Sequence, residues 1–400
     1  MSPRLLIALS ACALVACQDQ LSLDACDIRE ASCQNDVFLA VQAVRGTGWD
    51  PWLEPPPMRV ITRDQFRSEV EAATKARGDQ PEAYDYFTPA YKLFGLYDPD
   101  EMPQAATDFT VSFVAAYYDD GSDTVTIIDR GGKTDLREDT TTLAHELVHA
   151  AQRRDVGFGT IATWGSTADN VNARYALVEG EATLYENLVD TLLRKLSAHD
   201  LQWDKYHADW IASARKQIAM DPAPWRLARS SLRYPLGSRL LTTVWLKAGP
   251  LGVRRALAAH PTTTRYLMDV HGSHIAEGKV PEPCKAPTPP EGYKVISTTT
   301  LGAWASYAFA TRMLMESDAW NFGRDTRSDA FTIYANDDKQ LAVVWQLQFR
   351  SEAVAGAFVE ALAELPDNVH LSSAQDGDRV SLVAFSTPDA QPEFDWMSCS

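Results

Sequence analysis

The sequence has a deficit of positive charge and no apolar run of the roughly 20 residues that span a bilayer. Of its 400 residues, 37 are Lys or Arg and 54 are Asp or Glu, for a formal net charge of −17. A strongly acidic chain repels phosphate backbones, and its densest basic clusters are isolated pairs such as Arg153–Arg154. Nucleic acid is therefore excluded as an expected partner. With 21 glycines and 22 prolines, the chain is also neither fibrous nor of low complexity.

The longest apolar run lies near the N-terminus, at residues 5–16, after a single basic residue. A run of this length and position is typical of a secretory signal peptide. Residues 14–17 read Leu-Val-Ala-Cys, which resembles the lipobox of bacterial lipoproteins. We therefore expect residues 1–16 to be a lipoprotein signal and Cys17 to carry the lipid that holds the exported protein at a membrane. By the same resemblance, Gln18 favours the outer membrane, with the protein body in the periplasm or at the cell surface. The alternative is an ordinary signal peptide in which the cysteine is incidental.

Cysteine usage agrees with export to an oxidising compartment. Of the 6 cysteines, one lies inside the signal and one is the lipid site. The remaining cysteines can form two disulfides, for which the sequence allows three pairings. We favour a short local loop and a bridge across the C-terminal region, which are Cys26–Cys33 and Cys284–Cys399, respectively.

Length and patterning indicate an α+β protein with more than one domain, because 400 residues exceed the usual ~100–200 of one domain. Residues 17–57 are interpreted as a tether and lead-in. Residues 58–275 are expected to form a mainly helical domain that begins with a β-hairpin. A Pro-rich linker at 276–292 then leads to a small α+β domain at 293–400.

Several elements within these domains can be predicted from periodicity and turn residues. They are a strand at 58–62, a helix at 63–77, a hairpin with strands at 109–118 and 124–128, mostly helical structure at 140–259, strands at 331–334 and 341–345, a helix at 351–365 and a strand at 380–385.

The strongest chemical signal is the pattern His145-Glu146-x-x-His149. Residues i and i+4 of an α-helix lie about 40° apart, so both imidazoles project from one face and can bind one metal ion. Glu146 is rotated away from that pair and can reach a water molecule on the metal. We expect the helix to begin at Asp139 or Thr140, either of which can serve as its N-cap.

A catalytic zinc site needs a third protein ligand and leaves a fourth position for water. The next helical stretch, residues 173–186, offers two glutamates close together. Its apolar residues bracket Glu181, so helical periodicity favours Glu181 as the inward group and places Glu179 at the polar edge. From the residues alone, either carboxylate could be the ligand.

The sequence Glu179-Gly180-x-Ala182 follows His149 by 30 residues and resembles the third-ligand helix of gluzincin metallopeptidases. In that helix the glutamate before the glycine binds zinc, and glycine permits a close approach of helices beside the ligand. More narrowly, the chain resembles a largely uncharacterised family of exported bacterial gluzincin-like proteins. The segments that carry this resemblance are 114–119, 145–152 and 176–183, with weaker similarity at 234–237, 261–264 and 343–345, so that it covers most of residues 58–350.

The resemblance implies a zincin-like fold for residues 58–275 and one Zn²⁺ ion per chain. It implies His145, His149 and Glu179 as the zinc ligands, with Glu181 as an acidic neighbour or the alternative ligand. The expected reaction is hydrolysis of a peptide bond by a zinc-activated water, as in a metallopeptidase.

The resemblance also assigns roles around the metal. Glu146 would be the general base that takes the proton of the attacking water. Tyr234 is the candidate electrophile opposite the metal, because a Tyr or His from a downstream helix has that role in related enzymes. The alternative for Tyr234 is simple packing at the start of the helix predicted at 236–246.

The expected substrate is a peptide or protein. Either strand of the predicted hairpin, 109–118 or 124–128, could hold an extended peptide by β-addition if it lies at a sheet edge. The alternative function is a non-catalytic binding or scaffold lipoprotein, at the surface or in the periplasm, that retains the gluzincin fold with or without the metal.

Overall fold

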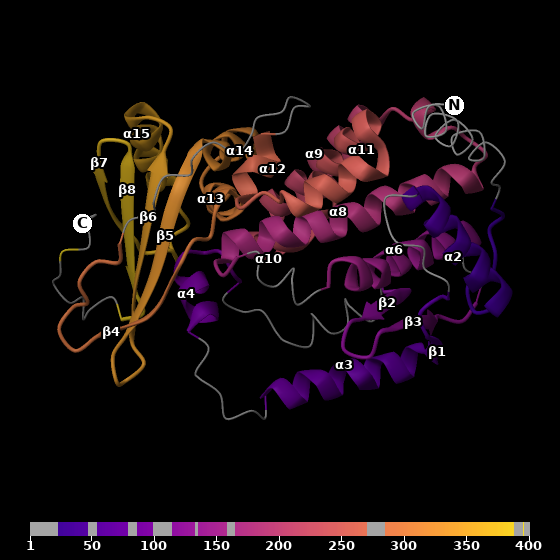
Figure 1. Cartoon of the computed structure of the whole chain (residues 1–400). Helices are drawn as coiled ribbons and strands as arrows, with labels where there is room; N and C mark the ends of the chain where they lie inside the picture. The colour runs from indigo at the N-terminus through magenta and orange to yellow at the C-terminus, as the bar shows by residue number, and fades with distance from the viewer. Residues whose placement is uncertain are drawn as a thin grey trace, which may run out of the picture.

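The computed structural model has an α+β architecture, as predicted, in which a layer of helices lies between two sheets (Figure 1). Across the described part of the chain, no helix is both long enough and apolar enough to cross a bilayer. The structure describes residues 23–46, 54–78, 86–98, 114–132, 135–157, 165–269, 285–387 and 395.

The small sheet has three strands, in the order β1-β3-β2. These are β1 (Met58–Thr62), β2 (Ala116–Asp119) and β3 (Thr124–Asp129). The predicted strand at 58–62 and the predicted hairpin are confirmed, although residues 109–113 lie outside the described part of the chain. β3 pairs in parallel with β1 and antiparallel with β2, so it is the central strand. The prediction that the strand at 124–128 lies at a sheet edge is therefore wrong. Of the two strands of the hairpin, β2 is the one at the edge of the sheet.

The helical layer has α8 at its centre, packed between α6 and α11 (Figure 1). The mostly helical structure predicted for 140–259 is confirmed, as is the helix at 63–77. The helices of this half are α2 (Ala31–Arg45), α3 (Arg63–Gly78), α4 (Phe87–Leu93), α6 (Leu136–Asp155), α8 (Ala168–Leu193), α9 (Trp203–Met220), α10 (Pro224–Ser231), α11 (Arg233–Ala258) and α12 (Thr264–Asp269), with a 3-10 turn η2 (Ala198–Asp200).

Helix α6 begins earlier than predicted. Asp135 is its N-cap, and its carboxylate accepts hydrogen bonds from the backbone N–H groups of Arg137 and Glu138. Asp139 and Thr140 lie one turn inside the helix, so their prediction as N-caps is wrong. Thr140 donates its hydroxyl proton to the Leu136 carbonyl, as a helix-interior threonine commonly does.

The segment interpreted as a tether contains helix α2, so that interpretation is wrong for residues 31–45. Its inner face, which includes Val37, Phe38 and Val41, is buried against α6 and α8. The predicted disulfide Cys26–Cys33 ties the entry of this helix. The predicted lipid site and second disulfide lie outside the described residues, at Cys17, Cys284 and Cys399.

The second sheet has five antiparallel strands in the order β4-β5-β6-β8-β7. The three strands and the helix predicted after residue 330 are confirmed as parts of β5, β6, β8 and α15. The two edge strands were not predicted, because both are largely exposed and lack an apolar pattern. The elements are β4 (Lys294–Thr299), α13 (Ala303–Ala310), α14 (Glu316–Asp325), β5 (Thr326–Ala335), β6 (Leu341–Phe349), α15 (Glu352–Ala361), the 3-10 turn η3 (Leu362–Glu364), β7 (Ser372–Asp376) and β8 (Arg379–Phe385).

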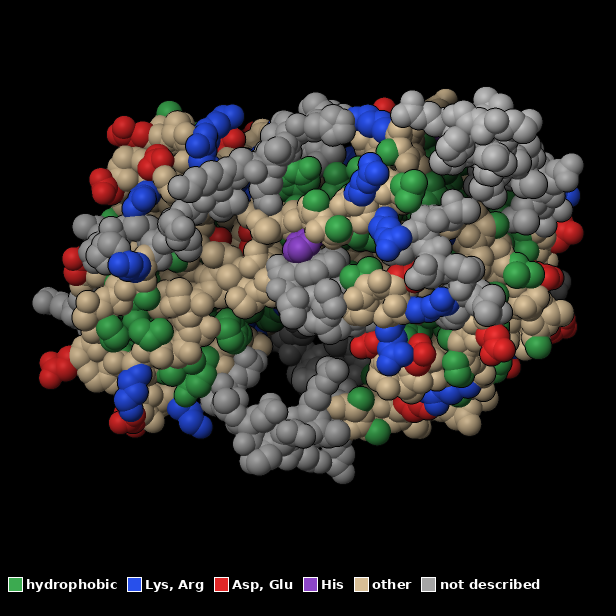
Figure 2. Space-filling model, in the orientation of Figure 1, with side chains coloured by type: hydrophobic (Ala, Val, Ile, Leu, Met, Phe, Trp, Pro, Cys, Tyr) green, Lys and Arg blue, Asp and Glu red, His purple; other side chains and the backbone are tan. Residues whose placement is uncertain are grey.

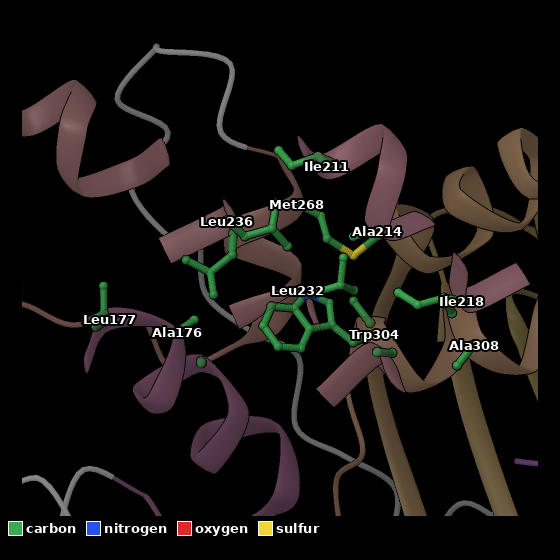
Figure 3. Close-up of a cluster of buried hydrophobic side chains, with 14 of the residues drawn as sticks. Ala176, Leu177, Ile211, Ala214, Ile218, Leu232, Leu236, Met268, Trp304 and Ala308 are labelled. Carbon is green, nitrogen blue, oxygen red and sulfur yellow. The ribbon is translucent and has the colours of Figure 1, made fainter. Parts of the chain in front are cut away.

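One hydrophobic cluster extends from α2 through α8 and α11 to the second sheet, across the predicted linker. Trp304 of α13 lies at its middle, beside Leu232 and Met268 of the helical layer (Figure 3). Trp304 is fully buried, and burial of such a side chain contributes about 2–3 kcal/mol to stability. The two predicted domains thus share one core, and α8 is packed within it.

Candidate metal centre

Three predicted ligands meet where α6 faces α8. The candidate ligand atoms of His145, His149 and Glu179 all lie within 4.8 Å of one another. The Glu179 Oε2 atom is 3.4 Å from the Nε2 atom of each histidine. Two imidazole nitrogens and one carboxylate oxygen therefore converge on one point.

Local helix geometry brings the two imidazoles together. His145 and His149 are one turn apart on α6, and their ring centroids lie 4.8 Å from each other. Leu143 and Leu147, on the other side of the helix, are fully buried and anchor it in the core. The rotation of the helix, and hence the direction of both rings, is set by this burial.

The outer nitrogen of each imidazole has a hydrogen-bond acceptor. His145 Nδ1 lies 3.0 Å from Oε2 of Glu186, and a carboxylate can only accept a proton there. His149 Nδ1 lies 2.9 Å from Oε1 of Gln152. With a metal in place of the proton on Nε2, each imidazole would keep its proton on Nδ1, and that is the tautomer that a metal requires.

Contacts on the amide nitrogen fix the orientation of Gln152. Its Nε2 donates to the Val178 carbonyl and to Oε2 of Glu181, both at 2.9 Å. The amide oxygen is therefore left to accept the proton of His149. Gln152 itself is buried, so this orientation is held on both sides.

Glu181 has a different partner from Glu179. It is fully buried, as periodicity predicted, and its Oε1 lies 3.0 Å from Nη2 of Arg45. Arg45 also pairs with Asp155 at 2.9 Å. The structure thus places Glu179 with the two histidines, whereas Glu181 supports His149 through Gln152.

Glu146 lies beside the three-residue group and against the edge of β2. Its Oε2 accepts a hydrogen bond of 2.8 Å from the backbone N–H of Tyr118. Burial raises the pKa of Glu146, and the neighbouring His149 and His145 only partly offset that effect. A carboxylate with a raised pKa accepts a proton more readily than an ordinary glutamate, as a general base must.

The cluster is electrostatically self-complementary. Burial acts to lower the pKa of His145, but the carboxylates of Glu179 and Glu186 outweigh it and raise that pKa well above its usual value. Burial acts to raise the pKa of Glu179, but the two imidazoles outweigh it and lower that pKa. A cation bound here would therefore displace protons from the histidines.

Tyr234 lies at the start of α11 and faces the same group. Its ring centroid is 6.1 Å from that of His145 and 6.5 Å from that of Trp210. Burial and the charges of Glu179 and Glu146 raise the pKa of Tyr234, so its hydroxyl stays protonated. The ring of Tyr234 thus lies near both Trp210 and the histidine pair.

Sequence reasoning assigned no role to Glu186, Gln152 or Arg45. A local signal existed for Glu186, because it follows Glu179 by seven residues, or two helical turns, and so shares its face. A local signal existed for Gln152 too, since it lies at i+3 from His149. None existed for Arg45, which is 136 residues away from Glu181.

A cavity of about 560 Å³ opens beside the group. Glu186, the partner of His145, is part of its wall, and so are the aromatic side chains of Trp203 and Tyr206. His145, His149 and Glu179 are not part of this wall, so Glu186 is the link between the cavity and the group.

Comparison with known proteins assigns no family, since no family model, no curated protein and no solved structure matches the chain. The interpretation of the site depends on its own geometry and chemistry.

Proposed function

We propose that the protein is a zinc metallopeptidase with a gluzincin-like arrangement, in which His145, His149 and Glu179 hold one Zn²⁺ ion. The observation that carries this proposal is the convergence of two Nε2 atoms and one carboxylate oxygen within 4.8 Å. The proposal includes the sequence-based expectation that the protein is an exported bacterial lipoprotein, anchored through Cys17.

The donor set fits zinc. Two imidazoles and one carboxylate are a common catalytic zinc set, and they leave a fourth position for water or substrate. The hydrogen bonds from His145 to Glu186 and from His149 to Gln152 orient both rings, which is the usual arrangement around a zinc-bound histidine. When bound, zinc supplies a Lewis acid that activates water and polarises a carbonyl.

Glu146 is the general base in this proposal. Its carboxylate lies beside the ligands and is held by the Tyr118 amide, so it can take a proton from the attacking water and pass it to the leaving amine. Tyr234, whose phenol stays protonated, would donate a hydrogen bond from its hydroxyl to an oxygen of the reacting peptide.

The edge of β2 is the proposed support for an extended substrate. The Ala115 carbonyl accepts the Ile128 N–H, so by alternation the backbone groups of Ala116 and Tyr118 point away from β3. The Tyr118 amide does point outward, since it donates to Glu146. A peptide that added to this edge would pass directly by the general base.

Metal analysis and a peptide assay test the proposal together. Residues 18–400 are purified, bound zinc is quantified, and cleavage of a peptide library is followed by mass spectrometry. We expect about one zinc per chain and an activity that Glu146→Gln lowers by about 10²–10⁴-fold while zinc is retained. The matched control is Glu360→Gln, at an exposed glutamate of α15, which should keep full activity.

The same experiment separates the alternative function. A protein that binds zinc but cleaves no peptide would be a binding or scaffold lipoprotein that retains the site. A wild-type protein that holds no zinc, even after refolding in its presence, would overturn the peptidase proposal and the form of the alternative that keeps the metal.

A further inference from the structure

Arg233 lies at the start of α11, immediately before Tyr234, and its guanidinium packs on α8. Its Nη2 donates to Oδ1 of Asn172 at 3.1 Å. Its guanidinium carbon lies 4.7 Å from the ring centroid of Tyr175, so the planar group is stacked on that ring. Two contacts from one helix therefore orient the guanidinium.

Those contacts place Arg233 over the face of α8 that carries Glu179. Residues 172, 175 and 179 follow one another at helical spacing and form one stripe. Seven residues separate Asn172 from Glu179, which corresponds to about 10 Å along the axis. An extended peptide advances about 3.3 Å per residue, so this distance is about three residues of substrate.

Arg233 has no acidic partner within the ranges that the structure describes. Its neighbour Arg229 contacts the Tyr97 hydroxyl, at 3.4 Å, and the ring of Trp225. Burial and the positive charge of Arg229 lower the pKa of Arg233, although the charge of Glu179 acts in the opposite direction.

Several arginines elsewhere on the protein are paired with carboxylates. Acidic and basic side chains lie next to one another around α3 and the small sheet, at the lower right of Figure 2, where Arg59 pairs with Glu69 at 2.8 Å. Arg137 likewise pairs with Asp190. In a chain of net charge −17, half-buried Arg233 lies beside the candidate metal centre with no carboxylate within ion-pair distance among the described residues.

We propose that Arg233, with Arg229 beside it, binds a carboxylate of the substrate, so that the protein acts on peptides with a free C-terminal carboxylate or an acidic side chain near the cleaved bond. This inference rests on the proposed peptidase function. Stacking on Tyr175 and the bond from Nη2 to Asn172 leave Nη1 available for a carboxylate. A guanidinium is suited to that recognition because it stays charged and donates charge-assisted hydrogen bonds to a carboxylate.

A binding measurement on the inactive protein tests this inference without catalysis. Peptides are titrated into zinc-loaded Glu146→Gln, and their affinity is measured by calorimetry. One series compares a free C-terminal carboxylate with the amide, with one to four residues after the expected cleavage position. A second series, with amidated ends, compares Asp with Asn at each of these positions, so that the two sources of a carboxylate are distinguished.

We expect one of the two carboxylates to improve affinity by about 10- to 100-fold, and Arg233→Gln to abolish that preference. Arg233→Lys retains the charge and should keep part of it, which separates recognition from a loss of folding. The matched control is Arg255→Gln, at an exposed arginine of the same helix, which should keep the preference.

The outcomes separate this inference from the proposed function. Equal affinity of all peptides for the parent protein, or a preference that survives in Arg233→Gln, overturns the carboxylate site even if wild type cleaves peptides. A preference lost in Arg233→Gln supports the site even if wild type cleaves none.

Discussion

The backbones of α8 and α11 touch at Gly180 and Gly237. A Cβ atom on Gly180 would overlap the backbone of Gly237, and one on Gly237 would overlap the carbonyl of Ala176. The contact lies beside Glu179 on one helix and three residues after Tyr234 on the other. Glycine at both positions thus sets the distance between the candidate metal ligands and the candidate electrophile.

Substitution of Gly180 by Ala should therefore destabilise the protein. The added methyl group meets backbone, which cannot rotate away, so we expect the free energy of unfolding to fall by about 1–3 kcal/mol or more, measured by urea denaturation. Gly356→Ala in α15 is the control, because its Cβ would meet only Gln375 at 3.7 Å. That variant should be up to about 1 kcal/mol more stable than wild type. Equal effects of the two substitutions would show that the contact between α8 and α11 can relax.

Substitution of Glu179 and of Glu181 should affect different properties, zinc binding in one case and stability in the other. Glu179→Gln should lose zinc, because it removes a charged ligand. Glu181→Gln should retain zinc but lower the free energy of unfolding by about 3 kcal/mol, because it leaves the buried Arg45 without one of its two carboxylates. Metal analysis and urea denaturation on the same samples distinguish the two. Loss of zinc from Glu181→Gln at full stability would reverse the assignment.

Gln152 should control zinc affinity through His149. In Gln152→Leu the Nδ1 proton of His149 has no acceptor, so we expect the zinc dissociation constant to rise about 10- to 100-fold in a chelator competition. The control is Gln217→Leu, at an exposed glutamine of α9. An unchanged zinc affinity in Gln152→Leu would mean that the ring is oriented without this hydrogen bond.

His207 should make stability depend on pH. Burial and the positive charge of Arg239 lower the pKa of His207 to about 4, although the Trp203 backbone and Asp204 act in the opposite direction. The unfolded chain, with a histidine pKa of about 6.5, binds a proton that the folded protein does not. The free energy of unfolding should therefore fall by about 3 kcal/mol as the pH falls from about 6.5 to about 4.

Replacement of His207 isolates this contribution. In His207→Gln, the free energy of unfolding should depend less steeply on pH over that range, because about one fewer proton is taken up on unfolding. Urea denaturation at several pH values measures this slope. His199→Gln, at an exposed histidine, is the control and should keep the slope of wild type. If the free energy of unfolding depends on pH equally steeply in His207→Gln and in wild type, His207 takes up its proton in the folded protein as well.

Much of the fold follows from local patterns. Alternation predicted β1, and helical periodicity predicted α3 and α15. The strands β5, β6 and β8 were predicted from runs of apolar and β-branched residues, and these strands are buried at most of their positions. The exposed edge strands β4 and β7 have no such pattern. Helix α2 was missed as well, although its inner face is buried against α6 and α8.

The sequence by itself determined that His145 and His149 share a face, because i, i+4 spacing in one helix requires no partner. It also determined that Glu181 points inward. Only the tertiary structure decided what each glutamate meets there. Arg45 arrives from a distant helix and pairs with Glu181, whereas Glu179 is left facing the two histidines. Periodicity reports burial alone, and the charge that a buried group meets is set by contacts between residues far apart in the chain.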